Sequence, residues 1–116
     1  MPPRNPRQAM LDIIGVIEEV RQWTEGRTIV DYAADSMMRR AIQRALEIVS
    51  EASRHLPREL KAERMQIPWS QIAKIGNVLR HRYDEVSETD LWTVVTLDLP
   101  ALETVVRRML EELDKD

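Results

Sequence analysis

Hydrophobic residues recur at helical spacing through most of this chain. The first set is spaced three or four residues apart: Met10, Ile13, Ile14, Ile17 and Val20. That spacing is typical of the buried face of an amphipathic helix. Asn5-Pro6 before the set is typical of a helix start, and Gly26 after it is typical of a helix end. The pattern therefore predicts a first helix between Pro6 and Gly26.

A second helix is predicted to begin near Asp31 or Asp35 and to end at Pro57. Its buried side follows the same spacing: Met38, Ile42, Ala45, Val49, Ala52 and Leu56. The stretch PRELKAERMQIP, residues 57–68, has the composition of a linker with room for one helical turn. Pro68 is predicted to start a third helix, because proline is favoured in the first helical turn.

The remaining chain predicts further helices. The apolar side of the third helix is Ile72, Ile75 and Leu79, with Val78 at its edge. Ser87 is predicted to cap a fourth helix, supported by Asp90 three residues later. Its inward side is Leu91, Trp92, Val95 and Leu99. Pro100 is predicted to bend or restart this helix, because it lacks an N–H and clashes with the preceding turn. The final segment is apolar at Leu102, Val105, Val106, Met109, Leu110 and Leu113.

These patterns predict one all-α domain over residues 1–116, an up-and-down bundle of four to five helices. The 116 residues suffice for one core, and the absence of cysteine removes disulfides and thiolate metal sites. The N-terminal stretch MPPRNPRQAM has no apolar signal region, and no later run is long enough to span a membrane. We therefore expect a soluble cytoplasmic protein. The net charge of −3 argues against a non-specific nucleic-acid coat but allows a local basic patch.

The candidate chemistry lies in KIGNVLRHRY, residues 74–83. Lys74, Asn77 and His81 share one stripe of the third helix, and Arg80 lies about 100° around the axis from His81. An imidazole can take a proton from a ribose 2′-hydroxyl or give one to a leaving 5′-oxygen, and a nearby cation can stabilise the phosphorane. These are the parts of metal-independent RNA cleavage. One histidine cannot be both acid and base, so a symmetric dimer would supply the second.

A less specific interpretation remains open for each of these residues. A histidine at a basic helix end is more often a surface residue or a partner of the helix dipole, and His55 has the same interpretation. Tyr83 is either a core tyrosine or, if the helix ends before it, an exposed one. Gly76, in mid-helix, is typical of close approach by another backbone or by a ligand. Glu47 and Glu51 could serve acid–base chemistry or a metal, but we favour solvation or pairing with arginines on another helix.

Three segments resemble the HepT family, which belongs to the HEPN group of helical nucleotide-binding and ribonuclease domains. They are AIQRALEIVSEASRHLP, then IPWSQIAKIGNVLRHRYDEV, then DLWTVVTLDLPALE. The resemblance covers roughly residues 4–113. It implies a HEPN-type bundle of four to five helices that forms a homodimer, and the toxin half of a type VII HepT/MntA toxin–antitoxin pair.

The resemblance also implies the roles of the site residues. The family motif is an arginine, four to six residues, a histidine, one residue and a tyrosine, and His81 and Tyr83 match its second half. The family commonly has Arg-Asn where this chain has Gly76-Asn77, so Lys74 or Arg80 would replace the motif arginine. Tyr83 is implied to be the residue that an MntA-like nucleotidyltransferase antitoxin modifies with AMP.

Two functions from different classes follow. The first is an endoribonuclease that cleaves RNA with His81, Arg80, Asn77 and Lys74, without a metal or another cofactor. The second is a HEPN subunit that binds nucleotide or RNA, or docks a nucleotidyltransferase, without cleaving. The intact His81 and Tyr83 favour the first, and Gly76 in place of arginine favours the second. The specificity of the motif makes a purely structural bundle the weakest alternative.

Overall fold

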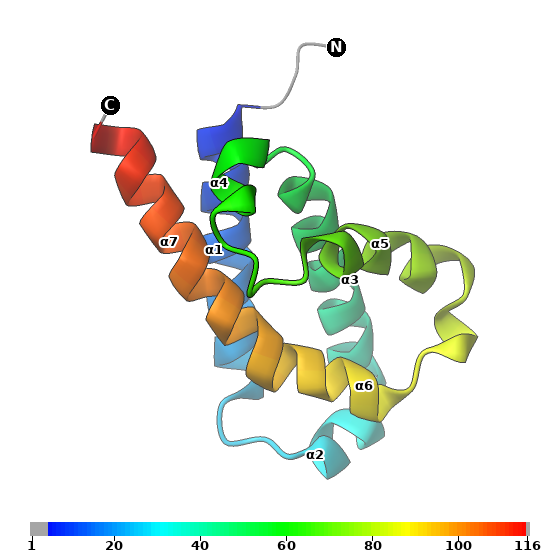
Figure 1. Cartoon of the computed structure of the whole chain (residues 1–116). Helices are drawn as coiled ribbons and strands as arrows, with labels where there is room; N and C mark the ends of the chain where they lie inside the picture. Colours follow the sequence, from blue (N-terminus) through cyan, green and yellow to red (C-terminus); the bar gives the residue numbers. More distant parts are fainter. Residues whose placement is uncertain (1–4, 116) are drawn as a thin grey trace.

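The computed structural model describes residues 5–115 (Figure 1). All the regular secondary structure of these residues is helical, and they contain no β-strand. Residues 1–4, at the start of the stretch considered above for a signal region, and residue 116 lie outside this range. The helices are α1 (Pro6–Thr24), α2 (Ile29–Ala34), α3 (Ser36–Ser53), α4 (Arg58–Ala62), α5 (Trp69–His81), α6 (Glu88–Thr93) and α7 (Leu99–Lys115). A 3₁₀ turn, η1 (Tyr83–Glu85), and a π turn, η2 (Val94–Asp98), complete them. None of these helices is long and apolar enough to cross a membrane.

The first predicted helix is confirmed as α1. The Asn5 side chain accepts a hydrogen bond from the backbone N–H of Arg7 at 2.8 Å and so caps the helix. Gly26 follows the last turn with φ of 72°, a conformation that glycine adopts without steric cost. The predicted apolar set of α1 is buried along its length.

The second predicted helix is in fact two helices. A capping box joins Thr28 and Asp31 at the start of α2, and the Asp35 carboxylate then caps α3 by accepting from Met38 N–H at 3.0 Å. Both aspartates therefore lie at a helix start, but the chain reorients between them. α3 ends at Ser53, before Pro57, and the single turn expected in the linker is α4.

The last helix is continuous through α6, η2 and α7, and Figure 1 shows that its axis changes direction between α6 and α7. Ser87 caps it by accepting from Asp90 N–H at 3.0 Å, as predicted. Just before Pro100 the Leu99 N–H bonds to the carbonyl of Val94, five residues back. A proline cannot supply the next N–H and crowds the turn before it. The π turn therefore accommodates Pro100 without ending the helix, and of the two predicted outcomes, a bend or a restart, the structure shows the bend.

The core lies where α1, α3 and α7 meet. Figure 1 shows α1 and α3 side by side, α7 slanting over α1, and α5 lying across α3. The crossing of α5 departs from a simple up-and-down order. At the lower end Tyr32 of α2 is fully buried, with its ring centroid 5.3 Å from that of Trp92. Burial, followed by the charge of Glu88, raises the pKa of Tyr32, and Arg39 opposes this, so the phenol stays neutral in the core.

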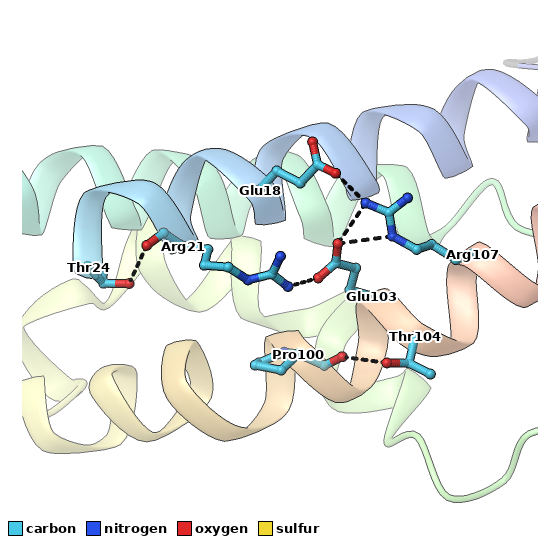
Figure 2. Close-up of polar contacts among 7 residues, drawn as sticks. All are labelled: Glu18, Arg21, Thr24, Pro100, Glu103, Thr104 and Arg107. Atoms are coloured by element: carbon cyan, nitrogen blue, oxygen red, sulfur yellow. Dashed lines mark hydrogen bonds and ion pairs between the residues drawn. The ribbon is translucent and has the colours of Figure 1, made fainter. Parts of the chain in front are cut away.

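A buried carboxylate ties α1 to α7 (Figure 2). Glu103 is only 5% exposed and accepts from Arg107 through Nε at 3.1 Å and Nη2 at 2.9 Å. Arg21 of α1 donates to its other oxygen, and Arg107 also contacts Glu18 of α1. The carboxylate thus has charged partners from both helices, as burial of a charge requires.

We expect Glu103→Gln to lower the free energy of unfolding by about 1–2 kcal/mol, because the three charge-assisted hydrogen bonds from Arg107 and Arg21 lose the acceptor's charge. The loss should stay below the roughly 3–5 kcal/mol of a fully buried pair, since both guanidinium groups can rehydrate. Urea unfolding measures it. Glu111→Ala, an exposed position of the same helix, is the control and should change stability by less than about 0.5 kcal/mol. Equal stability of the two variants would contradict this account of the pair.

Candidate active site

The outer face of α5 carries the predicted stripe. Lys74, Asn77 and His81 are all exposed there. Leu79, on the opposite side, is buried, and Ile72 and Ile75 pack against the core. The predicted division of this helix into an apolar and a polar side is therefore confirmed. We call Lys74, Asn77 and His81 the outer stripe.

Arg80 is held beside this stripe by a side-chain hydrogen bond. Its Nη2 donates to Asn77 Oδ1 at 2.8 Å, one helical turn away. The guanidinium remains exposed, so its other N–H groups can still bind an anion such as a phosphate. The bond limits the rotamers of a long side chain, and it places a cation one residue before His81.

Tyr83 lies outside the helix and is 64% exposed. α5 ends at His81, Arg82 leaves the helical conformation with φ of −144°, and Tyr83 begins the 3₁₀ turn η1. The interpretation of Tyr83 as a core residue is therefore wrong, and the expectation that the helix ends and frees the phenol is confirmed. Arg82 contacts Glu85 across this turn at 3.9 Å, a distance at which an exposed pair contributes little stability.

Gly76 is buried at the closest contact between α3 and α5. The Ser50 hydroxyl of α3 accepts from Gly76 N–H at 3.1 Å and donates to the carbonyl of Ala73 at 3.0 Å. Arg54 donates to the same carbonyl through Nη2 at 2.6 Å. A Cβ at position 76 would lie 2.9 Å from Ser50 Oγ and 3.1 Å from Ser50 Cβ. The close approach expected from Gly76 is confirmed, and it is made by a neighbouring helix.

This contact accounts for glycine at position 76, where the resemblance implied an arginine. Any side chain there would begin inside the space of Ser50, and the backbone of Glu47, one turn earlier on α3, lies 3.8 Å from the same Cβ position. With this packing the cations near His81 come from elsewhere on α5. Arg80 is the one that the structure orients, and Lys74 lies farther back on the outer stripe.

The other titratable candidates each pair with a residue three or four positions away, in α3 or in the turn that follows it. His55 lies 3.3 Å from Glu51, and Glu47 accepts from Arg44 at 3.2 Å. Glu51 is exposed, so the expected solvation is confirmed for that residue. Glu47 pairs with an arginine of its own helix and not of another helix, because spacings of three or four residues bring side chains together on a helix. Within residues 5–115, no three His, Cys, Asp or Glu side chains cluster in a way that could hold a metal ion.

An apolar groove of about 330 Å³ lies beside α5 and was not predicted from the sequence. Val78 and Ile75 of α5, Val86 after η1 and Leu99 of α7 are among its walls, and Lys74 lies at its edge. The only sequence signal was Val78, placed at the border of the apolar side. The groove joins segments far apart in the chain, and a helical pattern does not specify such a combination.

Comparison with known proteins defines the class. The family model described as ribonuclease HepT-like matches residues 13–109. The chain belongs to this HepT-like ribonuclease family, as its resemblance implied. No solved structure matches the chain.

Individual relatives agree with the family. The chain is 33% identical over 99 residues to a Thermococcus cleftensis protein named as a probable ribonuclease HepT, covering 85% of this chain and 90% of that one. It is 29% identical over 109 residues to a candidate RNase of Caldanaerobacter subterraneus, covering 94% and 97%. It is 32% identical over 104 residues to a Methanocaldococcus jannaschii protein named as a gamma-glutamylcyclotransferase and candidate RNase. That match covers 90% of this chain but 47% of the relative, so the chain spans about half of that protein.

We expect Gly76→Ala to lower the free energy of unfolding by about 1–3 kcal/mol, because the new methyl group overpacks the contact with Ser50. Helix propensity alone would have the opposite effect, because alanine in place of glycine raises the free energy of unfolding by about 1 kcal/mol. Gly15→Ala in α1 is the matched control, since a Cβ at position 15 would have nothing within 4 Å, and it should stabilise the protein. Urea unfolding compares the two. A Gly76→Ala protein at least as stable as the parent would contradict the proposed packing constraint.

Proposed function

We propose that this protein is the toxin of a type VII toxin–antitoxin system and acts in the cytoplasm as a metal-independent endoribonuclease. The observation that carries the proposal is the arrangement at the end of α5. There Asn77 orients Arg80 directly before an exposed His81, in a chain of the HepT-like ribonuclease family. The names of the relatives as ribonucleases agree with an RNA substrate.

The proposed reaction is an internal transesterification. His81 takes the proton of a ribose 2′-hydroxyl, the 2′-oxygen forms a bond to the adjacent phosphorus, and the bond to the 5′-oxygen breaks. The leaving oxygen receives a proton from a second imidazole, giving a 2′,3′-cyclic phosphate and a 5′-hydroxyl end. Arg80 stabilises the charge of the phosphorane, and Lys74 attracts the RNA backbone as a point charge.

Because the mechanism needs a second imidazole, we propose that the protein acts as a homodimer. Each chain has two histidines, and His55 is already next to Glu51. We propose that α5 of each subunit lies near the two-fold axis, so that two copies of Asn77, Arg80 and His81 share one groove. This gives the acid and the base their separate side chains.

A second candidate function is a HEPN-type subunit that binds RNA or nucleotide, or docks a nucleotidyltransferase, without cleaving. The observation that favours it is Gly76, because the contact with Ser50 leaves no space for an arginine there. Under this alternative the exposed cations would bind phosphates without catalysis.

We expect His81→Ala to abolish cleavage of RNA and growth inhibition, with a rate loss of about 10²–10⁴-fold or more. Arg80→Ala should lose about 10²–10³-fold, and Lys74→Ala less. All three residues are exposed, so these variants should keep the helical circular dichroism and unfolding midpoint of the parent. The assay is cleavage of end-labelled RNA by purified protein in EDTA.

The control is His55→Ala, which removes the histidine outside the site and should retain activity. Cleavage by His81→Ala at the parental rate would reject the mechanism. Loss of parental cleavage in EDTA would reject its independence from metals. A correctly folded parent without cleavage under any condition would instead support the binding subunit.

We further propose that an MntA-like nucleotidyltransferase inactivates the toxin by attaching AMP to Tyr83. The phenol oxygen forms a bond to the α-phosphorus of ATP, pyrophosphate leaves, and the phenolic proton passes to a base of the transferase. The exposure of Tyr83 supports this role, since an acceptor must enter another enzyme's active site. The added phosphate can then draw Arg80 and Arg82 away from RNA.

Incubation with the cognate transferase, ATP and Mg²⁺ should add the mass of one or more AMP groups and stop RNA cleavage. Tyr83→Phe should gain no mass, because the nucleophilic oxygen is absent. Intact-protein mass spectrometry measures both, and Tyr32 serves as an internal control because it is fully buried. A Tyr83→Phe protein that still gains AMP would overturn the assignment.

A further inference from the structure

The apolar groove beside α5 has the size and lining of a small-molecule site. Its volume of about 330 Å³ lies near the lower end of the roughly 300–1,000 Å³ usual for such sites. Ile75, Val78, Val86 and Leu99 give it apolar walls from three segments of the chain. Lys74 and Asp98 are the charged residues among those that line it.

The groove is lined by residues on both sides of the turn that carries Tyr83, Val78 before it and Val86 after it. Within that turn Val86 N–H bonds to the carbonyl of Tyr83 at 3.2 Å. The Tyr83 side chain itself is 64% exposed and does not line the groove. A group attached to the exposed phenol oxygen is therefore tethered three residues from Val86, which lines the groove.

Two charged groups at the groove have no ion-pair partner among residues 5–115. Within this described part of the chain, neither Lys74 nor Asp98 takes part in a salt bridge, although most arginines there do. Lys74 can donate hydrogen bonds and Asp98 can accept them. A flat apolar ligand with one donor and one acceptor along its edge would match this combination.

We propose that this groove binds the adenine ring of the AMP that Tyr83 carries, an inference that rests on the proposed modification of Tyr83. The faces of adenine pack against the apolar walls, its 6-amino group donates to Asp98, and a ring nitrogen accepts from Lys74. The base is then held along α5 between Lys74 and the turn that carries Tyr83. Lys74 is occupied by the base at the same time as Arg80 faces the phosphate, so the modified toxin has fewer cations for RNA.

The test is methyl NMR of the full chain, labelled at Ile, Leu and Val, before and after modification with AMP. The δ1 methyl of Ile75 and the methyls of Val78 and Val86 should shift, and those of exposed Val30 on α2 should not. Titration of unmodified protein with free AMP should move the same methyls, which tests the groove without the transferase. Cytidine monophosphate should move them less, because its base has a smaller apolar face.

Asp98→Ala should weaken binding of free AMP about tenfold, as expected for a hydrogen bond to a charged acceptor, while Tyr83 still gains the mass of AMP. Glu111→Ala, an exposed carboxylate of α7 outside the groove, is the matched control and should bind AMP like the parent. AMP on Tyr83 by mass without a shift of the groove methyls would overturn the inference and leave the proposed function intact.

If Tyr83 is not modified, the result is different. The protein would then gain no mass on incubation with the transferase and ATP, while free AMP would still shift the groove methyls. Methyls that shift on dilution of the protein and ignore AMP would show that a second copy of the chain occupies the groove. That result also overturns the inference.

Discussion

The arrangement of this molecule depends on the contact of Ser50 with the backbone of α5. One hydroxyl accepts from Gly76 and donates to Ala73, so only the short Ser50 side chain separates the two helix backbones at this point. Arg54 adds a charged donor to the same carbonyl. Because α5 is pressed onto α3 along this line, its opposite face must point outward. The outer stripe is exposed as a direct consequence.

Because of this contact, the residues that stabilise the fold differ from those assigned to the proposed chemistry. Residues that hold α5 in place, Ser50 and Gly76, are buried, whereas Asn77, Arg80 and His81 contribute little to the core. Substitutions in the second group can therefore report on function without unfolding the protein. The packing also leaves position 76 without a side chain, while farther along the helix an amide, Asn77, orients the guanidinium of Arg80.

Local signals in the sequence predicted the helix starts at Asn5, Asp35 and Ser87 correctly, because each cap is a contact within three residues. α2 as a separate helix was missed, since its capping box at Thr28 lies within a stretch too short to show periodicity. The crossing of α5, the partners of Glu103 and the apolar groove join segments far apart in the chain. Periodicity indicates which face of a helix is buried, but it does not specify the element that covers it.

Arg80 is central to the proposed mechanism, because it would supply the guanidinium that the family motif places elsewhere. Single-turnover cleavage of RNA by Arg80→Ala protein, with and without added guanidinium ion, tests this role most directly. We expect the slow variant to regain activity with guanidinium and not with ammonium, because a planar cation fits the phosphate and the Asn77 amide. Parental rates in Arg80→Ala without any additive would contradict the role of Arg80.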